Sequence, residues 1–242
     1  MSKVTLKNVN LGYKINRKEY NNVIDDLNMV IESEKISVII GESGSGKTTI
    51  IRAIAGILKV DKGNIYFDDI DVTDYDSTSR NVSYVSQMIG LYPNFTVFNN
   101  IAFPLKISHT PAEEIRERVY EVADMLKIAH CLTRKPRQLS IGQAQRVAIA
   151  RAIVKRSNVY LFDEPFSNLD KDLSRELTLE LKKLLTSLRA TVIFISHDLN
   201  EALSIADHVF VLKEGKVIFS DEPQKLIKSK DKDIVKLLEA SR

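Results

Sequence analysis

The sequence has one cysteine, Cys131, and four histidines in 242 residues. One cysteine cannot form an internal disulfide, and together with these scattered histidines it shows no zinc-ligand spacing. We expect Cys131 to be a small buried apolar side chain. No apolar run reaches the ~18–20 residues of a membrane span, and Met1–Thr5 lacks the apolar segment of a secretory signal. The chain is therefore expected in the cytosol unless a partner holds it at a membrane.

Neither positive nor negative side chains are in large excess. The formal net charge is +3, which does not require a nucleic-acid partner without clustered basic residues. Hydrophobic residues make up 44% and charged residues 28%, a composition typical of soluble globular proteins. Internal repeats and low-complexity linkers are missing, so the length fits one large α/β domain or two small ones.

The most informative segment is Gly41–Thr48, with the sequence GESGSGKT. It follows the β-branched run 36–40 and precedes a helix that starts near Lys47 and continues through 49–58, which is the context of a phosphate-binding loop. Glycines allow a tight turn whose N–H groups face an anion, and the helix start adds a positive dipole end. In such a loop Lys47 reaches the β- and γ-phosphates and the Thr48 hydroxyl ligates Mg²⁺. The alternative is an ordinary glycine-rich turn.

Strand and helix patterns alternate along most of the chain, which favours a mainly parallel sheet. Strands are expected at 4–11, 23–31, 36–40, 64–67, 82–85, 158–162 and 191–195, with a hairpin at 207–219 around Glu214–Gly215. Further helices are expected at 96–105, 111–127 with Thr110 as N-cap, 143–154 capped by Ser140, 171–188, and one last polar helix. The helical block from about 88 to 155 interrupts the pattern and indicates an insert.

A second motif is the apolar run Val159–Phe162 followed by Asp163 and Glu164. Carboxylates at a strand end can position Mg²⁺ or its water shell, here Asp163, and polarise an attacking water, here Glu164. The alternative is two solvated charges at a strand end.

A third motif, Leu139–Gln143, places Ser140 and Gly142 at the start of a helix, which is another anion site. A protein with one phosphate loop does not need two cradles for one nucleotide. We infer that this cradle covers the γ-phosphate of a nucleotide bound to another copy of the chain.

Taken together, the motifs resemble the nucleotide-binding domain of ATP-binding cassette (ABC) transporters over essentially the whole chain. Their order and spacing match the Walker A loop, the Q-loop, the signature motif LSGGQ, Walker B, the D-loop, the switch histidine and the adenine-stacking aromatic residue. In this sequence these are 41–48, Gln87, 139–143, 159–164, 167–170, His197 and Tyr13. Single residues of this set, such as Gln87, His197 or Tyr13, are weak evidence when taken alone. A lone histidine is more often structural, and a lone tyrosine more often belongs to a core.

The resemblance implies one domain, residues 1–242, with a P-loop NTPase (RecA-like) core of about 1–87 and 156–242. It also implies a mainly parallel sheet, an N-terminal antiparallel β-subdomain and an α-helical subdomain of about 88–155. Two copies would close head to tail around two ATP molecules with Mg²⁺. Nucleotide contacts are implied for Tyr13, Gly41, Glu42, Ser43, Gly44, Ser45, Gly46, Lys47, Thr48, Thr49, Gln87, Ser140, Gly142, Gln143, Asp170 and His197.

The implied catalytic residues are Glu164, which orients or deprotonates water, and His197, which contacts the γ-phosphate, with Lys47 and Gln87. Metal contacts are implied for Thr48, Gln87 and Asp163. Gln87 would link the metal and water to the helical insert, and Asp170 would lie across the dimer interface.

One residue departs from the family pattern: Ile141 stands where the signature motif has glycine. Isoleucine disfavours positive φ and adds bulk beside the nucleotide, so the local geometry and the hydrolysis rate are open questions. Gly142 is retained, and Ser140 and Gly142 are expected to keep their contacts.

The segments 80–87 and 91–105 are similar to importer ATPases, especially those of sugar and polyamine uptake. They would form the groove for a coupling helix of polytopic permease subunits, which would hold this chain at the cytoplasmic face of the membrane. An extracellular solute-binding protein is a further expected partner, whereas nucleic acid is not expected. From the short stretch after 226–228, we expect this chain to differ from the longer sugar-importer ATPases in lacking their C-terminal regulatory domain. The alternatives are an exporter ATPase, a soluble non-transport ABC ATPase and a P-loop kinase.

Overall fold

The computed structural model describes residues 1–14 and 20–240. One of its two sheets is antiparallel with the strand order β2-β1-β4-β5. Its strands are β1 (Val4–Lys14), β2 (Tyr20–Ile31), β4 (Lys62–Phe67) and β5 (Ile70–Asp71). The two N-terminal strands and the strand near 64–67 are thus confirmed. The sequence did not predict β5, a two-residue pairing within the acidic 68–74 segment.

The second sheet has the order β10-β9-β3-β8-β7-β6. All its neighbouring strands are parallel except the edge pair β9–β10, the predicted hairpin. Its strands are β3 (Ile36–Gly41), β6 (Val82–Val85), β7 (Val159–Asp163), β8 (Thr191–Ile195), β9 (His208–Lys213) and β10 (Lys216–Asp221). The predicted α/β class with a parallel sheet and a separate antiparallel sheet is confirmed.

The parallel strands read as continuous apolar runs because both faces of this sheet are buried. Side chains alternate between the faces, so one strand feeds two hydrophobic cores. In β7, for example, Tyr160 and Phe162 belong to one core, whereas Val159 and Leu161 belong to the other. The first core also contains the helices that follow β6, and the second contains α1 (Lys47–Ile54) and the antiparallel sheet.

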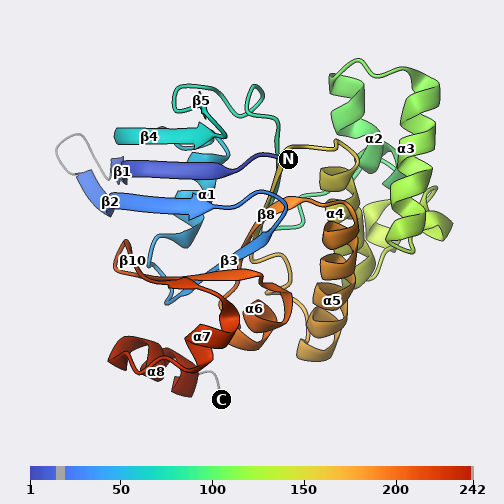
Figure 1. The fold of residues 1–242 in the computed structure, drawn as a ribbon. Coiled ribbons are helices and arrows are strands. Elements are labelled where there is room, and N and C mark those ends of the chain that lie inside the picture. Colours follow the sequence, from blue (N-terminus) through green and yellow to red (C-terminus); the bar gives the residue numbers. More distant parts are fainter. Residues whose placement is uncertain (15–19, 241–242) are drawn as a thin grey trace.

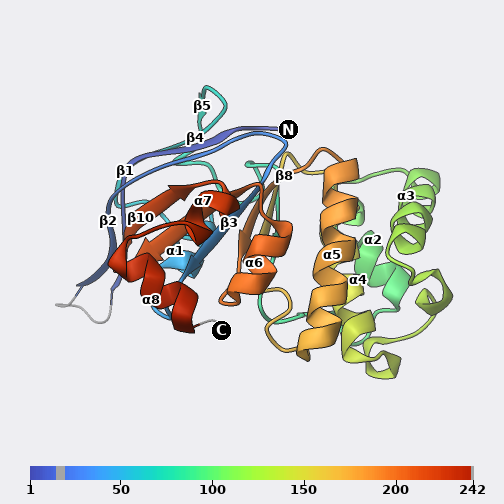
Figure 2. The ribbon, with the colours of Figure 1, turned by 60° about the horizontal axis from the view of Figure 1, so that its bottom comes forward.

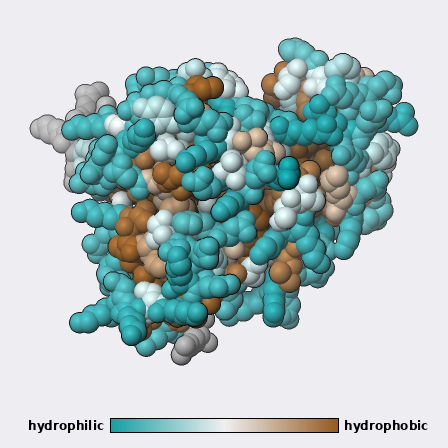
Figure 3. All heavy atoms as spheres, viewed as in Figure 1, coloured by the Kyte–Doolittle hydropathy of each residue, from teal (hydrophilic) through white to brown (hydrophobic). Residues whose placement is uncertain are grey.

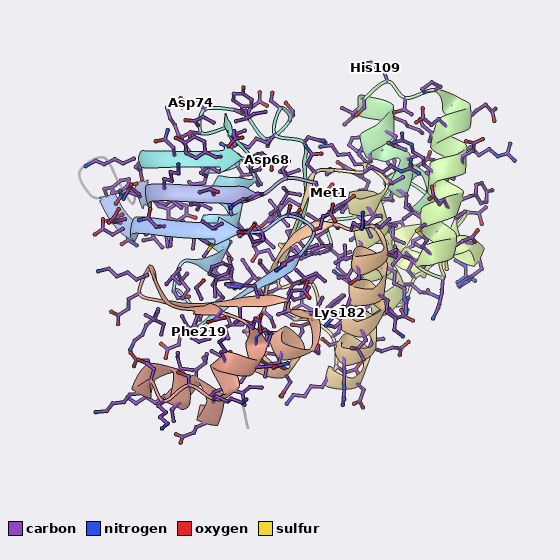
Figure 4. All side chains as sticks on the ribbon, viewed as in Figure 1. Met1, Asp68, Asp74, His109, Lys182 and Phe219 are labelled. Carbon is purple, nitrogen blue, oxygen red and sulfur yellow. The ribbon has the colours of Figure 1, made fainter. Side chains whose placement is uncertain are left out.

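Most helices lie on the side of the parallel sheet opposite α1 (Figure 1). They are α2 (Val97–Ile107), α3 (Ala112–Met125), α4 (Ile141–Ile153), α5 (Lys171–Ser187) and α6 (Leu199–Ile205), followed by α7 (Pro223–Ile227) and α8 (Lys232–Ala240) near the C-terminus. Figure 2 shows α2, α3 and α4 as a group at one end of the molecule, with α5 between them and α6. Lys182 of α5, labelled in Figure 4, donates to the carbonyl of Ser204 at 2.8 Å and so ties α5 to α6.

Several predicted helix limits were wrong. Helix α1 ends at Ile54 rather than near 58, because Gly56 adopts φ +72° and terminates it. Helix α3 begins at Ala112 with Pro111 rather than Thr110 at the N-cap position. The helix α6 was not predicted, because seven residues carry too little periodicity. The single polar helix expected at the end is two helices, α7 and α8.

The surface in Figure 3 is mostly hydrophilic, with separate hydrophobic patches. In the part of the chain that the structure describes, no helix combines the length and hydrophobicity that a bilayer crossing requires. Asp68 and Asp74 lie at the margin of the antiparallel sheet in Figure 4 and are exposed.

A buried arginine fixes the end of α1. Arg80 is 3% exposed, and its guanidinium donates to the carbonyls of Ala53 at 2.6 Å, Ile54 at 3.0 Å, Thr73 at 2.8 Å and Tyr75 at 3.0 Å. The last carbonyls of a helix lack partners within the helix, so this side chain satisfies them and neutralises the negative dipole end.

We expect Arg80→Met to lower the free energy of unfolding by roughly 3 kcal/mol, because it leaves several buried carbonyls unpaired. Urea denaturation measures this loss. The exposed Arg116 on α3 offers a matched control, since Arg116→Met should change stability by less than about 0.5 kcal/mol. Equal stability of both variants would contradict the role of Arg80.

Candidate functional site

The phosphate-binding loop connects the end of β3 to α1, as the sequence predicted. Gly44 and Gly46 adopt φ +80° and +105°, the left-handed region that favours glycine. At Gly46 a Cβ would also lie 2.5 Å from Cδ1 of Ile24, so the close approach of β2 leaves no space for a side chain. The loop therefore depends on glycine both for its turn and for its packing.

Lys47 is the first residue of α1 and is only 6% exposed. Its ammonium donates to the carbonyls of Gly41 at 2.9 Å and Glu42 at 2.8 Å. Burial lowers the pKa of Lys47, and the nearby charges of Glu164 and Asp163 oppose that shift. An ammonium has three donors, so one remains for a phosphate oxygen. The buried hydroxyl of Ser45 in the same loop has no partner among the described residues, which fits a loop built to receive a polar ligand.

Asp163 at the end of β7 is 4% exposed, and each of its carboxylate oxygens accepts one hydrogen bond. Oδ1 accepts from the Thr48 hydroxyl at 3.0 Å, and Oδ2 accepts from the Tyr84 hydroxyl at 2.8 Å. Burial, followed by the bond to Asp163, raises the pKa of Tyr84 to about 12. The phenol therefore keeps its proton at neutral pH and donates to the carboxylate. Sequence reasoning placed Tyr84 only on a strand; the adjacency of its strand to the Asp163 strand was the missing information.

The donors here suit a hard divalent cation. Mg²⁺ is usually held by one or two protein oxygens together with phosphate oxygens and water. Thr48 and Asp163 offer a hydroxyl and a carboxylate side by side. The described residues contain no group of three or more His, Cys, Asp or Glu side chains that could hold a metal by themselves. These residues fit a cation that arrives with a nucleotide.

Glu164 and His197 come together from the ends of neighbouring strands β7 and β8. Nδ1 of His197 lies 3.1 Å from Oε2 of Glu164, and the Glu164 side chain is 21% exposed against 60% for His197. Glu164 has φ +47°, a strained conformation for a residue other than glycine, and its N–H donates to the carbonyl of Ile195 at 3.1 Å. Strain of this kind, on the order of 1–3 kcal/mol, concentrates at functional sites.

Glu201 of α6 anchors the loop that carries His197 through a hydrogen bond to Ser196. The Glu201 carboxylate accepts from the Ser196 hydroxyl and from the Thr178 hydroxyl, the latter at 3.0 Å. Burial raises the pKa of Glu201, partly offset by these hydrogen bonds. Sequence reasoning missed Glu201, although its spacing of four residues from His197 was visible.

Tyr13 and Gln87 lie at the margins of the site. The Tyr13 hydroxyl donates to Thr49 Oγ1 at 3.2 Å, which places this exposed ring beside the start of α1. The exposed Gln87 follows β6, and its carbonyl accepts from Asn168 Nδ2 at 3.4 Å. The residues before α5 and those after β6 therefore touch.

The signature segment lies elsewhere. Ser140 is the N-cap of α4: its hydroxyl accepts from the N–H of Gln143 at 3.2 Å, and the Gln143 side chain accepts from the N–H of Ser140 at 3.1 Å. In both Figures 1 and 2, α4 stands well apart from α1. No hydrogen bond or ion pair joins 139–143 to 41–49 within the described ranges. One chain thus assembles the loop, Asp163, Glu164 and His197, but not the second cradle.

Ile141 is accommodated without backbone strain. It is the first helical residue of α4, is 49% exposed, and is absent from the described residues with positive φ. The next residue is tightly packed: a Cβ on Gly142 would lie 3.2 Å from Cδ2 of Leu173, so the leucine side chain would have to shift by a few tenths of an ångström. Leu173 belongs to the first turn of α5, whose N-cap Asp170 accepts from the N–H of Leu173 at 3.0 Å.

Comparisons with known proteins agree with this geometry. A family model described as ABC transporter matches residues 24–167. The sn-glycerol-3-phosphate import ATP-binding protein UgpC of Bartonella quintana (strain Toulouse) is 43% identical over 204 residues, which cover 83% of this chain and 59% of that protein. The spermidine/putrescine import ATP-binding protein PotA of Haemophilus influenzae (strain ATCC 51907 / DSM 11121 / KW20 / Rd) is 40% identical over 212 residues, covering 87% and 57%. The chain thus spans less than two thirds of the length of these relatives.

Solved structures with the same fold are also ATP-binding cassettes. The dimeric, post-hydrolysis structure of the cassette MJ0796 bound to ADP and Pi matches with a TM-score of 0.80 and 32% identity, covering 91% of this chain and 98% of that one. The structure of cbiO1 from Clostridium perfringens, part of the ABC transporter complex cbiONQ, matches with a TM-score of 0.84 and 29% identity, covering 94% and 91%. On its motifs, its fold and these matches, the chain belongs to the ABC transporter family.

Proposed function

We propose that the chain is the ATP-binding and ATP-hydrolysing subunit of an ABC transporter and that it works as a head-to-tail dimer. The observation that carries the proposal is the division of the site. The Lys47 loop, Asp163, Glu164 and His197 gather at one edge of the parallel sheet, whereas Ser140 presents a second helix start on a distant face. A second copy supplies the cradle that one chain cannot bring to its own nucleotide.

The chemistry follows from the positions of the side chains. Lys47 and the loop bind the β- and γ-phosphates. Glu164 accepts a proton from water as the water oxygen bonds to the γ-phosphorus and the bond to the leaving ADP oxygen breaks. His197 stabilises the charge that develops on the γ-phosphate and holds Glu164 at the 3.1 Å contact. Mg²⁺, held through Thr48 and Asp163 with Gln87 nearby, would neutralise phosphate charge when bound. Tyr13 stacks on the adenine, and Asp170 lies across the dimer interface.

The transport role rests on the named relatives and on a groove. UgpC and PotA are import ATP-binding proteins, so we favour import over export. A cavity of about 290 Å³ lies between β6, α2 and α4, and is lined in part by Met88, Tyr92, Ile107 and Arg151. Met88 and Ile107 are 79% and 61% exposed. Apolar side chains in a hollow of this kind fit a short helix of a permease, which would hold the chain at the cytoplasmic face of the membrane. An extracellular solute-binding protein would complete an importer.

The domain limits inferred from the sequence fit this assignment. In this proposal a core of about 1–87 and 156–242 carries the nucleotide loop, a helical subdomain of about 88–155 carries the signature segment, and the groove lies between the two. We propose that movement of one against the other transmits the state of the nucleotide to the permease.

We expect Glu164→Gln to bind ATP and accumulate as a dimer while hydrolysis falls by ~10²–10⁴-fold, because an amide cannot take the proton from water. Light scattering with ATP and phosphate release measure the two effects. The exposed Glu176 of α5 offers the control Glu176→Gln, which should hydrolyse normally. Normal phosphate release by Glu164→Gln would remove Glu164 from this role.

We expect Gly142→Ala to bind ATP normally but to weaken ATP-dependent dimerisation by roughly tenfold, about 1.4 kcal/mol, because the new methyl group pushes against the Leu173 side chain at the start of α5. Removing the leucine in the double variant Gly142→Ala/Leu173→Ala should restore part of the loss. Sedimentation with ATP measures dimerisation, and Leu179→Ala on the exposed side of α5 is the size-matched control for Leu173→Ala. An unchanged dimer in Gly142→Ala would refute the importance of this contact.

We expect Ile107→Asp to abolish co-purification with a permease encoded beside this chain, because a charge enters the apolar groove. ATP binding should persist, since the groove is separate from the loop. The exposed Ile227 of α7 gives the control Ile227→Asp, which should co-purify normally. Co-purification of Ile107→Asp at the normal level would contradict the groove assignment.

A further inference from the structure

Tyr84 is a polar residue at the site that the proposed mechanism does not use. It lies on β6, in register with Leu161 of β7. Alternation along β7 places Leu161 and Asp163 on one face, the face that carries α1. The Tyr84 ring packs against the same core, and from there its hydroxyl reaches Oδ2 of Asp163 at 2.8 Å. A strand that contributes nothing to the nucleotide loop thus contacts the one buried carboxylate beside it.

A positive charge on α1 also lies near the phenol. Burial raises the pKa of Tyr84, and Arg52 partly offsets that rise. Arg52 lies four residues after Thr48, on the same side of α1, and Thr48 donates to the other carboxylate oxygen of Asp163 at 3.0 Å. The three side chains Thr48, Asp163 and Tyr84 therefore form a continuous hydrogen-bonded chain that joins α1, β7 and β6.

We propose that Tyr84 is a positioning residue for the divalent cation that accompanies the nucleotide, a role that rests on the proposed function. Rotation of a carboxyl group about its last bond is soft, so packing alone does not fix the plane of the Asp163 carboxylate. The bond from Tyr84 holds Oδ2 and leaves Oδ1 beside Thr48, facing the end of the phosphate loop. Groups that orient a metal-binding carboxylate from behind typically change metal affinity by ~10–100-fold when they are removed.

The test uses Tyr84→Phe, which removes one hydroxyl and keeps the packed ring. Mn²⁺ serves as the probe, and its binding to the ADP-loaded chain is followed by electron paramagnetic resonance, which does not depend on turnover. The expected result is ~10–100-fold weaker Mn²⁺ binding. Binding of fluorescent ADP in EDTA should be unchanged, because no cation takes part. Tyr75 is exposed on the surface, and Tyr75→Phe should behave as wild type in both assays.

The outcomes separate this inference from the proposed function. Wild-type Mn²⁺ affinity in Tyr84→Phe would overturn the role of Tyr84. A loss of ADP affinity in EDTA as large as the loss of Mn²⁺ affinity would also overturn it, because the tyrosine would then shape the nucleotide pocket itself. A wild-type chain that binds no nucleotide would instead overturn the proposed function, and this inference with it.

Discussion

The parallel pairing of β3, β8 and β7 is the constraint on which the site depends. Ile39 of β3 is in register with Ile195 of β8, and Ile195 is in register with Asp163 of β7. These ladders bring three chain segments to the same edge, although more than a hundred residues separate the first from the second. The loop after β3, the two carboxylates at the end of β7 and the histidine after β8 then lie together, and the contacts of Thr48 with Asp163 and of His197 with Glu164 join them. Burial of both faces of the sheet fixes the register, because a slip by one residue would exchange the side chains of the two cores and disrupt the packing of each.

The charged side chains at this edge of the sheet suit a ligand that combines anionic phosphates with a cation. Lys47 is buried and its pKa is lowered, while Asp163 and Glu164 lie near enough to oppose that shift. Buried charges are costly unless they are paired or hydrogen-bonded. Here backbone carbonyls satisfy the ammonium, and the hydroxyls of Thr48 and Tyr84 satisfy the Asp163 carboxylate. A polyphosphate with its cation can replace these internal partners with stronger ones, so binding and local order are coupled.

On the helical side of the molecule, the N-termini of α4 and α5 are stabilised by their own N-caps and by packing against each other. Ser140 caps α4 and Asp170 caps α5, and Gly142 lets the first turn of α5 approach through Leu173. The signature segment 139–143 and the segment 167–170 before α5, which the sequence suggests for the nucleotide and the dimer interface, thus meet where Gly142 packs against Leu173. The glycine at 142 suits that close contact because it has no side chain, whereas the isoleucine at 141 is compatible because its backbone is helical.

Local chemistry in the sequence was sufficient for the phosphate loop, the strand that ends in Asp163 and Glu164, and the cap at Ser140. Each of these depends on residues within about ten positions of one another, because the turn, the helix start and the apolar run are adjacent in the sequence. Only the tertiary structure decided which distant groups meet them. Tyr84 reaches Asp163 because β6 pairs with β7, Glu201 holds Ser196 because α6 folds back over that loop, and Arg80 completes the end of α1 from 27 residues away. The reason is physical: these contacts follow from strand order and helix packing, and no spacing in the sequence encodes which strand lies next to which.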